Sequence, residues 1–166
     1  MIYYRPIAYS ISVLGILALV TVTVGQQEPP PPVAPMTIDP PAGLPPVPVP
    51  KDNPVTAAKV ELGKMLYFDK RMSKDKTISC ATCHDPKKGW AEREPTSKGI
   101  DKQVGERNAP TVINAAYMTS MFWDGRAKDL EEQALGPIQN PMEMGMKMEL
   151  VTDELGKIPE YQKRFK

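Results

Sequence analysis

The sequence predicts an all-α fold with long loops for residues 51–166, preceded by an apolar N-terminal helix and a proline-rich linker. Apolar residues in this part recur at three- and four-residue spacing, which is typical of one face of an amphipathic helix. No run alternates apolar and polar residues for long enough to indicate a sheet. The stretch 86–107 is polar and punctuated by glycine and proline, so it predicts a long irregular loop.

The first expected helix opens at Asn53-Pro54, because asparagine caps helices well and proline suits a first turn. Its apolar face consists of Val55, Ala58, Leu62, Met65 and Leu66. A short helix or turn is expected in the stretch SCATCH. Later helices are expected at 127–135, where Gly136-Pro137 would end the helix, at 147–157, and from Pro159 into the chain end.

The first 25 residues carry one positive charge, at Arg5, followed by an uncharged apolar run at 6–25. This pattern predicts a signal peptide, with Thr23-Val24-Gly25 as the cleavage site. The run is also close to the roughly 20 residues that span a bilayer, so an uncleaved anchor in the inner membrane is the main alternative. A buried helix is a third interpretation. Either of the first two predicts an exported, periplasmic protein.

Residues 26–50 are expected to form a Pro-rich linker without a packed core, because proline fixes the backbone and removes hydrogen-bond donors. A membrane tether explains such a linker well. The whole chain has 21 basic and 20 acidic residues, a net charge of +1. A nucleic-acid binder normally carries a clustered basic excess, so we expect no nucleic-acid partner.

The chemistry of the chain centres on Cys80, Cys83 and His84, which form a C-x-x-C-H sequence. This pattern is typical of covalent c-type haem attachment, with two thioethers to the cysteines and the histidine on the iron. A disulfide would leave the adjacent histidine unexplained. A zinc site normally needs four ligands, and the chain has no other cysteine or histidine. The sequence therefore predicts one covalently bound haem c.

Because His84 is the only histidine, the second axial position cannot be filled by another histidine of this chain. Methionine is the usual sixth ligand in small electron-transfer cytochromes. Four candidates stand close together: Met142, Met144, Met146 and Met148. Residue spacing alone leaves two interpretations open, a monohaem electron carrier with His/Met ligation and an enzyme with an open distal site.

Three stretches resemble the N-terminal haem domain of bacterial di-haem cytochrome c peroxidases and the related MauG-type oxidases. They read LGKMLYFDKRMSKDKTISCATCHDPKKGW, RNAPTVINAAY and FWDGRAKDLEEQALGPIQNPMEMG, and they occur in the family's order within residues 62–146. The resemblance implies two haem domains in the whole protein, one peroxidatic and one for electron transfer. A haem module that serves as an assembly or docking partner of another cytochrome is a further alternative.

By this resemblance His84 would be the proximal ligand of the peroxidatic iron. Gln133, Pro137 and Glu143 would line its distal pocket, Trp123 would relay electrons between the haems, and Asn108 would contribute to a calcium site at the domain junction.

The chemistry implied by the resemblance is the reduction of hydrogen peroxide to water. Glu143 would move a proton between the two peroxide oxygens, which a carboxylate can do when it is held within hydrogen-bond reach. Gln133 would orient the peroxide or a water. The implied electron donor is a cytochrome or cupredoxin, and a protein side chain as the oxidised substrate is the MauG-like variant.

Two departures from the family pattern matter. Many of these peroxidases carry a histidine before RNAPT that blocks the distal site until reductive activation, whereas SKGIDKQVGER has none. We therefore expect a distal site that is open without activation. The sequence also contains no second C-x-x-C-H, so we expect the electron-transfer haem to come from a further domain, in cis or in trans.

Overall fold

The computed structural model describes residues 34–166. The predicted signal peptide or anchor and the first part of the linker lie outside the described residues. The rest of the linker, 34–50, is exposed and contains no helix. Its backbone is tied to the domain by hydrogen bonds from Met36 N to Val55 O (2.9 Å) and from Tyr117 Oη to Pro45 O (3.0 Å). Within 34–166, no helix is both long and apolar enough to cross a membrane.

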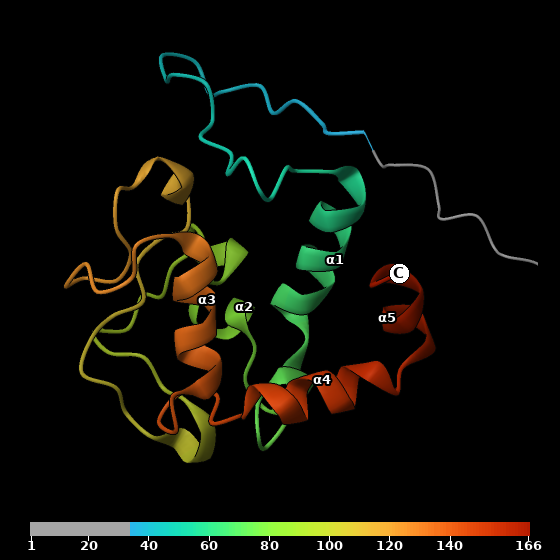
Figure 1. Ribbon diagram of the computed structural model, residues 1–166. Coiled ribbons are helices and arrows are strands. Elements are labelled where there is room, and N and C mark those ends of the chain that lie inside the picture. Colours follow the sequence, from blue (N-terminus) through green and yellow to red (C-terminus); the bar gives the residue numbers. More distant parts are fainter. Residues whose placement is uncertain (1–33) are drawn as a thin grey trace, which may run out of the picture. The chain divides into compact units, whose positions relative to one another are not determined.

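The described part of the chain is helical, with only isolated β-bridges (Figure 1). This confirms the predicted all-α class for these residues. The α-helices are α1 (Ala57–Phe68), α2 (Cys80–Cys83), α3 (Leu130–Gln139), α4 (Met148–Gly156) and α5 (Pro159–Arg164). Short 3-10 turns lie at η1 (Lys70–Met72), η2 (Pro86–Lys88), η3 (Ile100–Lys102) and η4 (Ala115–Tyr117). The helices expected at 147–157 and from Pro159 are confirmed as α4 and α5.

The expected start of the first helix at Asn53-Pro54 is wrong. Helix α1 begins at Ala57, and Thr56 is its N-cap, with a side chain that accepts a hydrogen bond from Lys59 N at 3.2 Å. The Asn53 side chain is bonded instead to Lys59 Nζ, at 2.6 Å, and to the Glu131 carboxylate. The Asn53 side chain therefore bonds to other side chains and does not cap the first turn of α1.

The expected helix end at Gly136-Pro137 is also wrong, because α3 runs through both residues to Gln139. Pro137 has no amide hydrogen, so it removes one bond inside the helix. The last turn is held by the chain that follows: Met144 N bonds to Pro137 O at 3.2 Å, and Met146 N bonds to Ile138 O at 2.8 Å. The helix starts at Leu130 rather than 127 because Asp129 caps it, accepting from Glu132 N at 2.8 Å.

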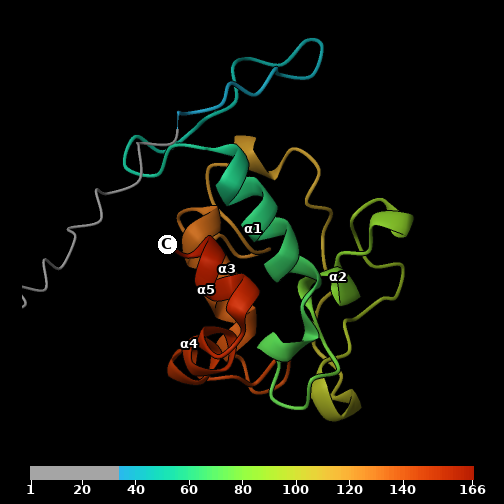
Figure 2. The same ribbon diagram turned by 90° about the vertical axis from the view of Figure 1, so that its right-hand side faces the viewer.

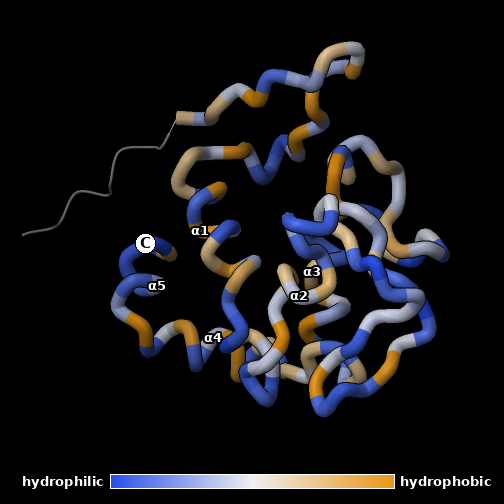
Figure 3. The backbone as a smooth tube through the Cα atoms, turned by 180° about the vertical axis from the view of Figure 1, so that it is seen from behind, coloured by the Kyte–Doolittle hydropathy of each residue, from blue (hydrophilic) through white to orange (hydrophobic). Residues whose placement is uncertain are grey.

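A small core joins the C-terminal helices to α1 and η1. Helix α4 packs on η1 and α5, and α5 also packs on α1 (Figure 2). The buried core residues are Met72, Ile138, Met144, Met146, Val151, Leu155 and Tyr161. Figure 3 shows polar and apolar residues alternating in short stretches along α1, α4 and α5, as expected for helices that bury only one face.

A buried polar contact fixes α5 to the end of α1. Tyr161 is 1% exposed, and its hydroxyl donates to Asp69 Oδ2 at 2.7 Å. Arg71 donates to both Asp69 oxygens, and its guanidinium lies over the Tyr161 ring. Burial opposes the ionised form, but hydrogen bonds from Arg71 and Tyr161 leave the pKa of Asp69 below its ordinary value. Burial, with Asp69 nearby, raises the pKa of Tyr161 to about 12.

We predict that Tyr161→Phe lowers the free energy of unfolding at pH 7 by about 1–2 kcal/mol, because a buried hydrogen bond to a charged acceptor is lost. The lowered pKa of Asp69 gives stability that is present above the unfolded pKa of about 3.9 and is lost as the pH falls through the folded pKa. Urea unfolding of parent and variant should therefore begin to converge below about pH 4 and converge further as the pH falls through the folded pKa of Asp69.

The matched control is Tyr117→Phe, which removes an exposed hydrogen bond to the uncharged carbonyl of Pro45. Its effect should be smaller and independent of pH. An equal destabilisation by Tyr161→Phe at pH 7 and in acid would contradict a role for the Asp69 charge.

Candidate functional site

Both cysteines lie on one turn of helix. The α2 turn begins after Ser79, whose amide donates to Thr82 Oγ1 at 2.9 Å. Cys80 and Cys83 are three residues apart and therefore share a helix face. Both are half-buried free thiols. This spacing on a single turn suits two attachment points on one edge of a flat cofactor.

The environment of these thiols keeps them protonated at neutral pH. Burial raises the pKa of Cys80. Burial, followed by the negative charge of Glu92, raises the pKa of Cys83 to about 11. A hydrogen bond with Ser97 opposes this shift, and the charge of Glu143 adds to it. A metal-binding or nucleophilic cysteine normally has a lowered pKa. Neither thiol therefore has the lowered pKa of an activated nucleophile.

His84 is oriented by contacts on its ring and its backbone. Its Nδ1 lies 2.8 Å from the carbonyl oxygen of Pro110. A carbonyl can only accept, so Nδ1 carries a proton; in the neutral ring this tautomer leaves the lone pair on Nε2. The backbone is held by His84 N to Cys80 O at 2.9 Å and by Tyr67 Oη to His84 O at 2.8 Å. A ring fixed in this tautomer is typical of a histidine that binds a metal through Nε2.

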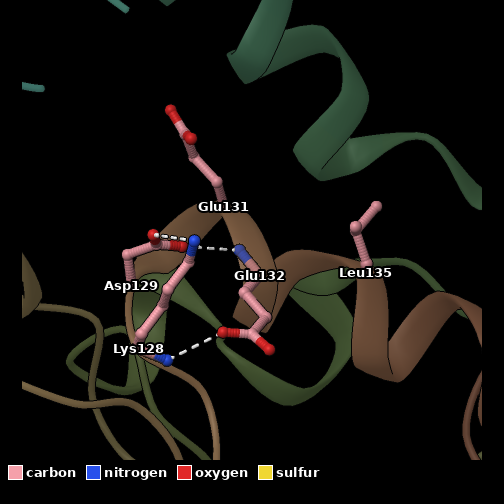
Figure 4. A pocket seen from close by; sticks show the side chains of 5 residues that line it. All are labelled: Lys128, Asp129, Glu131, Glu132 and Leu135. Atoms are coloured by element: carbon pink, nitrogen blue, oxygen red, sulfur yellow. Dashed lines mark hydrogen bonds and ion pairs between the residues drawn. The ribbon is translucent and has the colours of Figure 1, made fainter. Parts of the chain in front are cut away.

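Helices α1 and α3 each expose large apolar side chains. These are Val60 and Phe68 on α1 and Leu130 and Leu135 on α3. Figure 4 shows Leu135 and Glu131 on the side of α3 that faces α1, at a surface depression of about 450 Å³. The depression is otherwise lined by charged residues, and none of the predicted haem ligands borders it.

Taken together, two protonated thiols on one helix turn, an imidazole with a free Nε2 and exposed apolar helix faces fit a covalently attached haem. His84 would hold the iron, and Cys80 and Cys83 would hold the porphyrin edge.

The residues expected at the distal side come from α3 and the turn after it. Gln133 and Pro137 are four residues apart on α3, so they share one face, and both are half-buried. Glu143 is also half-buried, and its Oε1 accepts from Asn140 Nδ2 at 2.8 Å. Asn140 was missed by sequence reasoning, although an asparagine directly after a helix is a known turn signal.

The methionines beside Glu143 have different environments. Met144 and Met146 are 2% and 7% exposed and belong to the core, and Met148 packs against that core. Met142 is exposed. The core therefore accounts for three of the four methionines that were candidates for an iron ligand.

Trp123 and Asn108 are brought together although they are distant in sequence. Trp123 Nε1 donates to Asn108 O at 2.8 Å, and the Trp123 side chain is 64% exposed. Asn108 Nδ2 donates to the carbonyls of Glu92 and Glu94, at 3.1 and 2.6 Å. Within residues 34–166, no three His, Cys, Asp or Glu side chains are grouped to hold a metal ion. A calcium site at Asn108 therefore stays a prediction.

Comparison with known proteins places these features in a family. The profile of the family described as di-haem cytochrome c peroxidase matches residues 57–166. The chain is 50% identical over 116 residues to cytochrome c551 peroxidase of Pseudomonas aeruginosa, covering 70% of this chain and 34% of that protein. It is 46% identical over 120 residues to methylamine utilization protein MauG of Methylorubrum extorquens, covering 72% and 34%.

A solved structure, that of a MauG-like protein associated with microbial copper homeostasis, superimposes with a TM-score of 0.72 at 31% identity. The alignment covers 78% of this chain and 39% of that one. The chain thus spans about a third of the length of the two curated relatives. With its C-x-x-C-H turn, its oriented histidine and a family match over 57–166, this chain belongs to the di-haem cytochrome c peroxidase family.

Proposed function

We propose that residues 51–166 form the peroxidatic haem domain of a di-haem cytochrome c peroxidase-like protein that reduces hydrogen peroxide to water. The observation that carries this proposal is the environment of the segment that follows α3. Its methionines Met144 and Met146 are buried in the core, whereas Glu143 is half-buried with its carboxylate held by Asn140. The segment therefore offers a carboxylate, while two of its four thioethers are buried in the core.

A haem held here would supply the redox-active iron that the reduction of peroxide needs. His84 would hold this iron from the proximal side through Nε2, with Nδ1 fixed on the carbonyl of Pro110. Glu143 would take a proton from one peroxide oxygen and deliver it to the other, which leaves as water. Gln133 would orient the peroxide without titrating. The complete reduction consumes two electrons and two further protons and yields two waters.

The electrons would come from a cytochrome or cupredoxin through a second haem domain, in cis or in trans. Trp123 would be the relay, since its ring is largely exposed and its indole nitrogen is fixed on Asn108. A calcium ion at Asn108 would stiffen the same junction. We place the protein in the periplasm, with residues 6–25 as a cleaved signal or an inner-membrane anchor.

The first prediction concerns the cofactor. Mature protein expressed together with haem-maturation machinery should gain the mass of one haem, and a double Cys80→Ser/Cys83→Ser variant should gain none, because no thiols remain to form thioethers. Mass spectrometry decides the result. An unmodified parent with a Cys80–Cys83 disulfide would contradict covalent haem attachment.

A second prediction concerns the distal side of the iron. The stretch Ser97–Arg107 lacks histidine and two of the four methionines are buried, so the ferric haem should be high-spin or weakly ligated without prior reduction. Electron paramagnetic resonance measures this directly. A purely low-spin His/Met signal that disappears on replacing Met142 or Met148 would favour the monohaem electron carrier instead.

The third prediction concerns Glu143. Replacing it by glutamine keeps its shape and its acceptor for Asn140 but removes the base, so the first reaction with peroxide should slow by about 10²–10⁴-fold, or roughly 3–5 kcal/mol. Stopped-flow mixing with hydrogen peroxide, followed by haem absorption in a single turnover, measures this without a second haem domain. Haem content should not change.

The matched control is Glu149→Gln, an exposed carboxylate in the first turn of α4. It should react at the parent rate. A loss below about tenfold in Glu143→Gln would remove Glu143 from the proton transfer.

A further inference from the structure

A short loop that none of the steps above uses is docked against the turn that carries Glu143. This 98–104 loop is closed by an antiparallel bridge between Lys98 and Val104. Its own backbone bonds, from Gly99 N to Gln103 O at 2.9 Å and from Gln103 N to Ile100 O at 3.0 Å, give it a fixed shape. Ile100 is 3% exposed, so the loop is not a free surface excursion.

Two hydrogen bonds join the loop to the 140–145 turn. Ile100 N donates to the carbonyl oxygen of Glu143 at 2.8 Å, and Gln103 Nε2 donates to the carbonyl oxygen of Pro141 at 3.0 Å. The turn itself is built on Asn140, whose carbonyl accepts from Glu143 N at 3.0 Å and from Gly145 N at 2.9 Å. Both backbone polar groups of Glu143 are therefore hydrogen-bonded. Its N–H bonds to Asn140 in the same turn, and its carbonyl accepts from Ile100 in the loop.

Glycines allow the two backbones to touch. A Cβ atom at Gly99 would overlap the carbonyl oxygen of Met142 and would lie 2.6 Å from both Cα and O of Glu143. A Cβ atom at Gly145 would lie 2.6 Å from Cδ1 of Ile100. Gly99 has φ −93° and ψ −158°, a conformation open to any residue. The need for glycine at this position therefore comes from the contact with Glu143 and not from the backbone angles.

Proton transfer depends on where the carboxylate sits. A base must lie within about 2.6–3.2 Å of the proton it takes, and a displacement of about 1 Å can cost about 10²-fold in rate. Asn140 holds the Glu143 carboxylate at 2.8 Å, but that bond fixes only the end of the side chain. The 98–104 loop packs against the Cα atom of Glu143, from which the side chain departs, and bonds to the carbonyl of the same residue.

We propose that the 98–104 loop is a positioning element for Glu143, and that Gly99 is the positioning residue that allows the loop to dock on the Glu143 backbone. This inference rests on the proposed role of Glu143 as the base. A methyl group at position 99 must push the two backbones apart by about 1 Å before normal van der Waals contact returns. The carboxylate of Glu143 moves with its backbone.

The test is a cycle of four haem-loaded, full-length proteins: the parent, Gly99→Ala, Glu143→Gln and the double variant. In single-turnover stopped-flow with hydrogen peroxide, Gly99→Ala should slow the reaction by about 10–100-fold. In the Glu143→Gln background, Gly99→Ala should slow the reaction by less than about a further threefold, because a residue that acts through Glu143 then has no base left to position. A general structural defect would instead slow both backgrounds equally.

A second readout does not depend on activity. Amide hydrogen exchange at Ile100, whose N–H is bonded to the Glu143 carbonyl, should accelerate in Gly99→Ala because the loop is undocked. The matched control is Gly105→Ala, just outside the loop, where a Cβ would meet only Ser97 O at 3.4 Å. This control should keep both the parent exchange rate and the parent reaction rate.

If Gly99→Ala fails to fold, Gln103→Leu replaces it. This variant removes the side-chain bond to Pro141 O, at 3.0 Å, and a longer one to Ile100 O within the loop, at 3.4 Å, and should slow the reaction by about 3–10-fold in the parent alone. Equal losses in both backgrounds, or faster Ile100 exchange with an unchanged reaction rate, overturn the positioning role while the base assignment stands. A Glu143→Gln loss below about tenfold overturns both.

Discussion

The hydrogen bond from His84 Nδ1 to the carbonyl of Pro110 is the interaction on which the rest of the site depends. It fixes the imidazole tautomer, and it also ties the attachment helix to the segment 108–110. The first residue of that segment, Asn108, accepts the Trp123 indole N–H on its carbonyl and reaches the carbonyls of Glu92 and Glu94 with its side chain. One short stretch of chain therefore sets the positions of the proximal histidine and of the proposed electron relay.

The shortage of large apolar residues explains the methionines. The chain has three Phe and two Trp, but ten Met. Methionine is flexible and fills irregular gaps, so the core uses Met72, Met144 and Met146 where a larger domain would use aromatic side chains. Burial of Met144 and Met146 also holds the end of the 140–145 turn, which carries Glu143. The same short segment thus supplies buried methionines to the core and a half-buried carboxylate to the proposed distal site.

The sequence predicted the parts of the fold that follow from local chemistry. The C-x-x-C-H turn, α4 and the start of α5 at a proline all depend on neighbouring residues. The start of α1 and the end of α3 were wrong because contacts outside the helices decide them. Asn53 bonds to Glu131 and Lys59, and the last turn of α3 is held by Met144 and Met146. Gly99 could not be found for the same reason, since its contact with Glu143 joins segments more than forty residues apart.

The loop before RNAPT contains no histidine, so the control that a histidine would give is not available to it. A histidine in this loop would couple the distal site to pH and to iron ligation, because imidazole titrates near neutral pH and binds metals. In this chain the loop docks on the turn of Glu143 through backbone and amide hydrogen bonds and through contacts made by glycines. None of these groups titrates or binds iron. The position of the Glu143 backbone is therefore set by hydrogen bonds and packing that do not depend on pH or on iron ligation, which suits the proposed distal site that needs no preceding activation step.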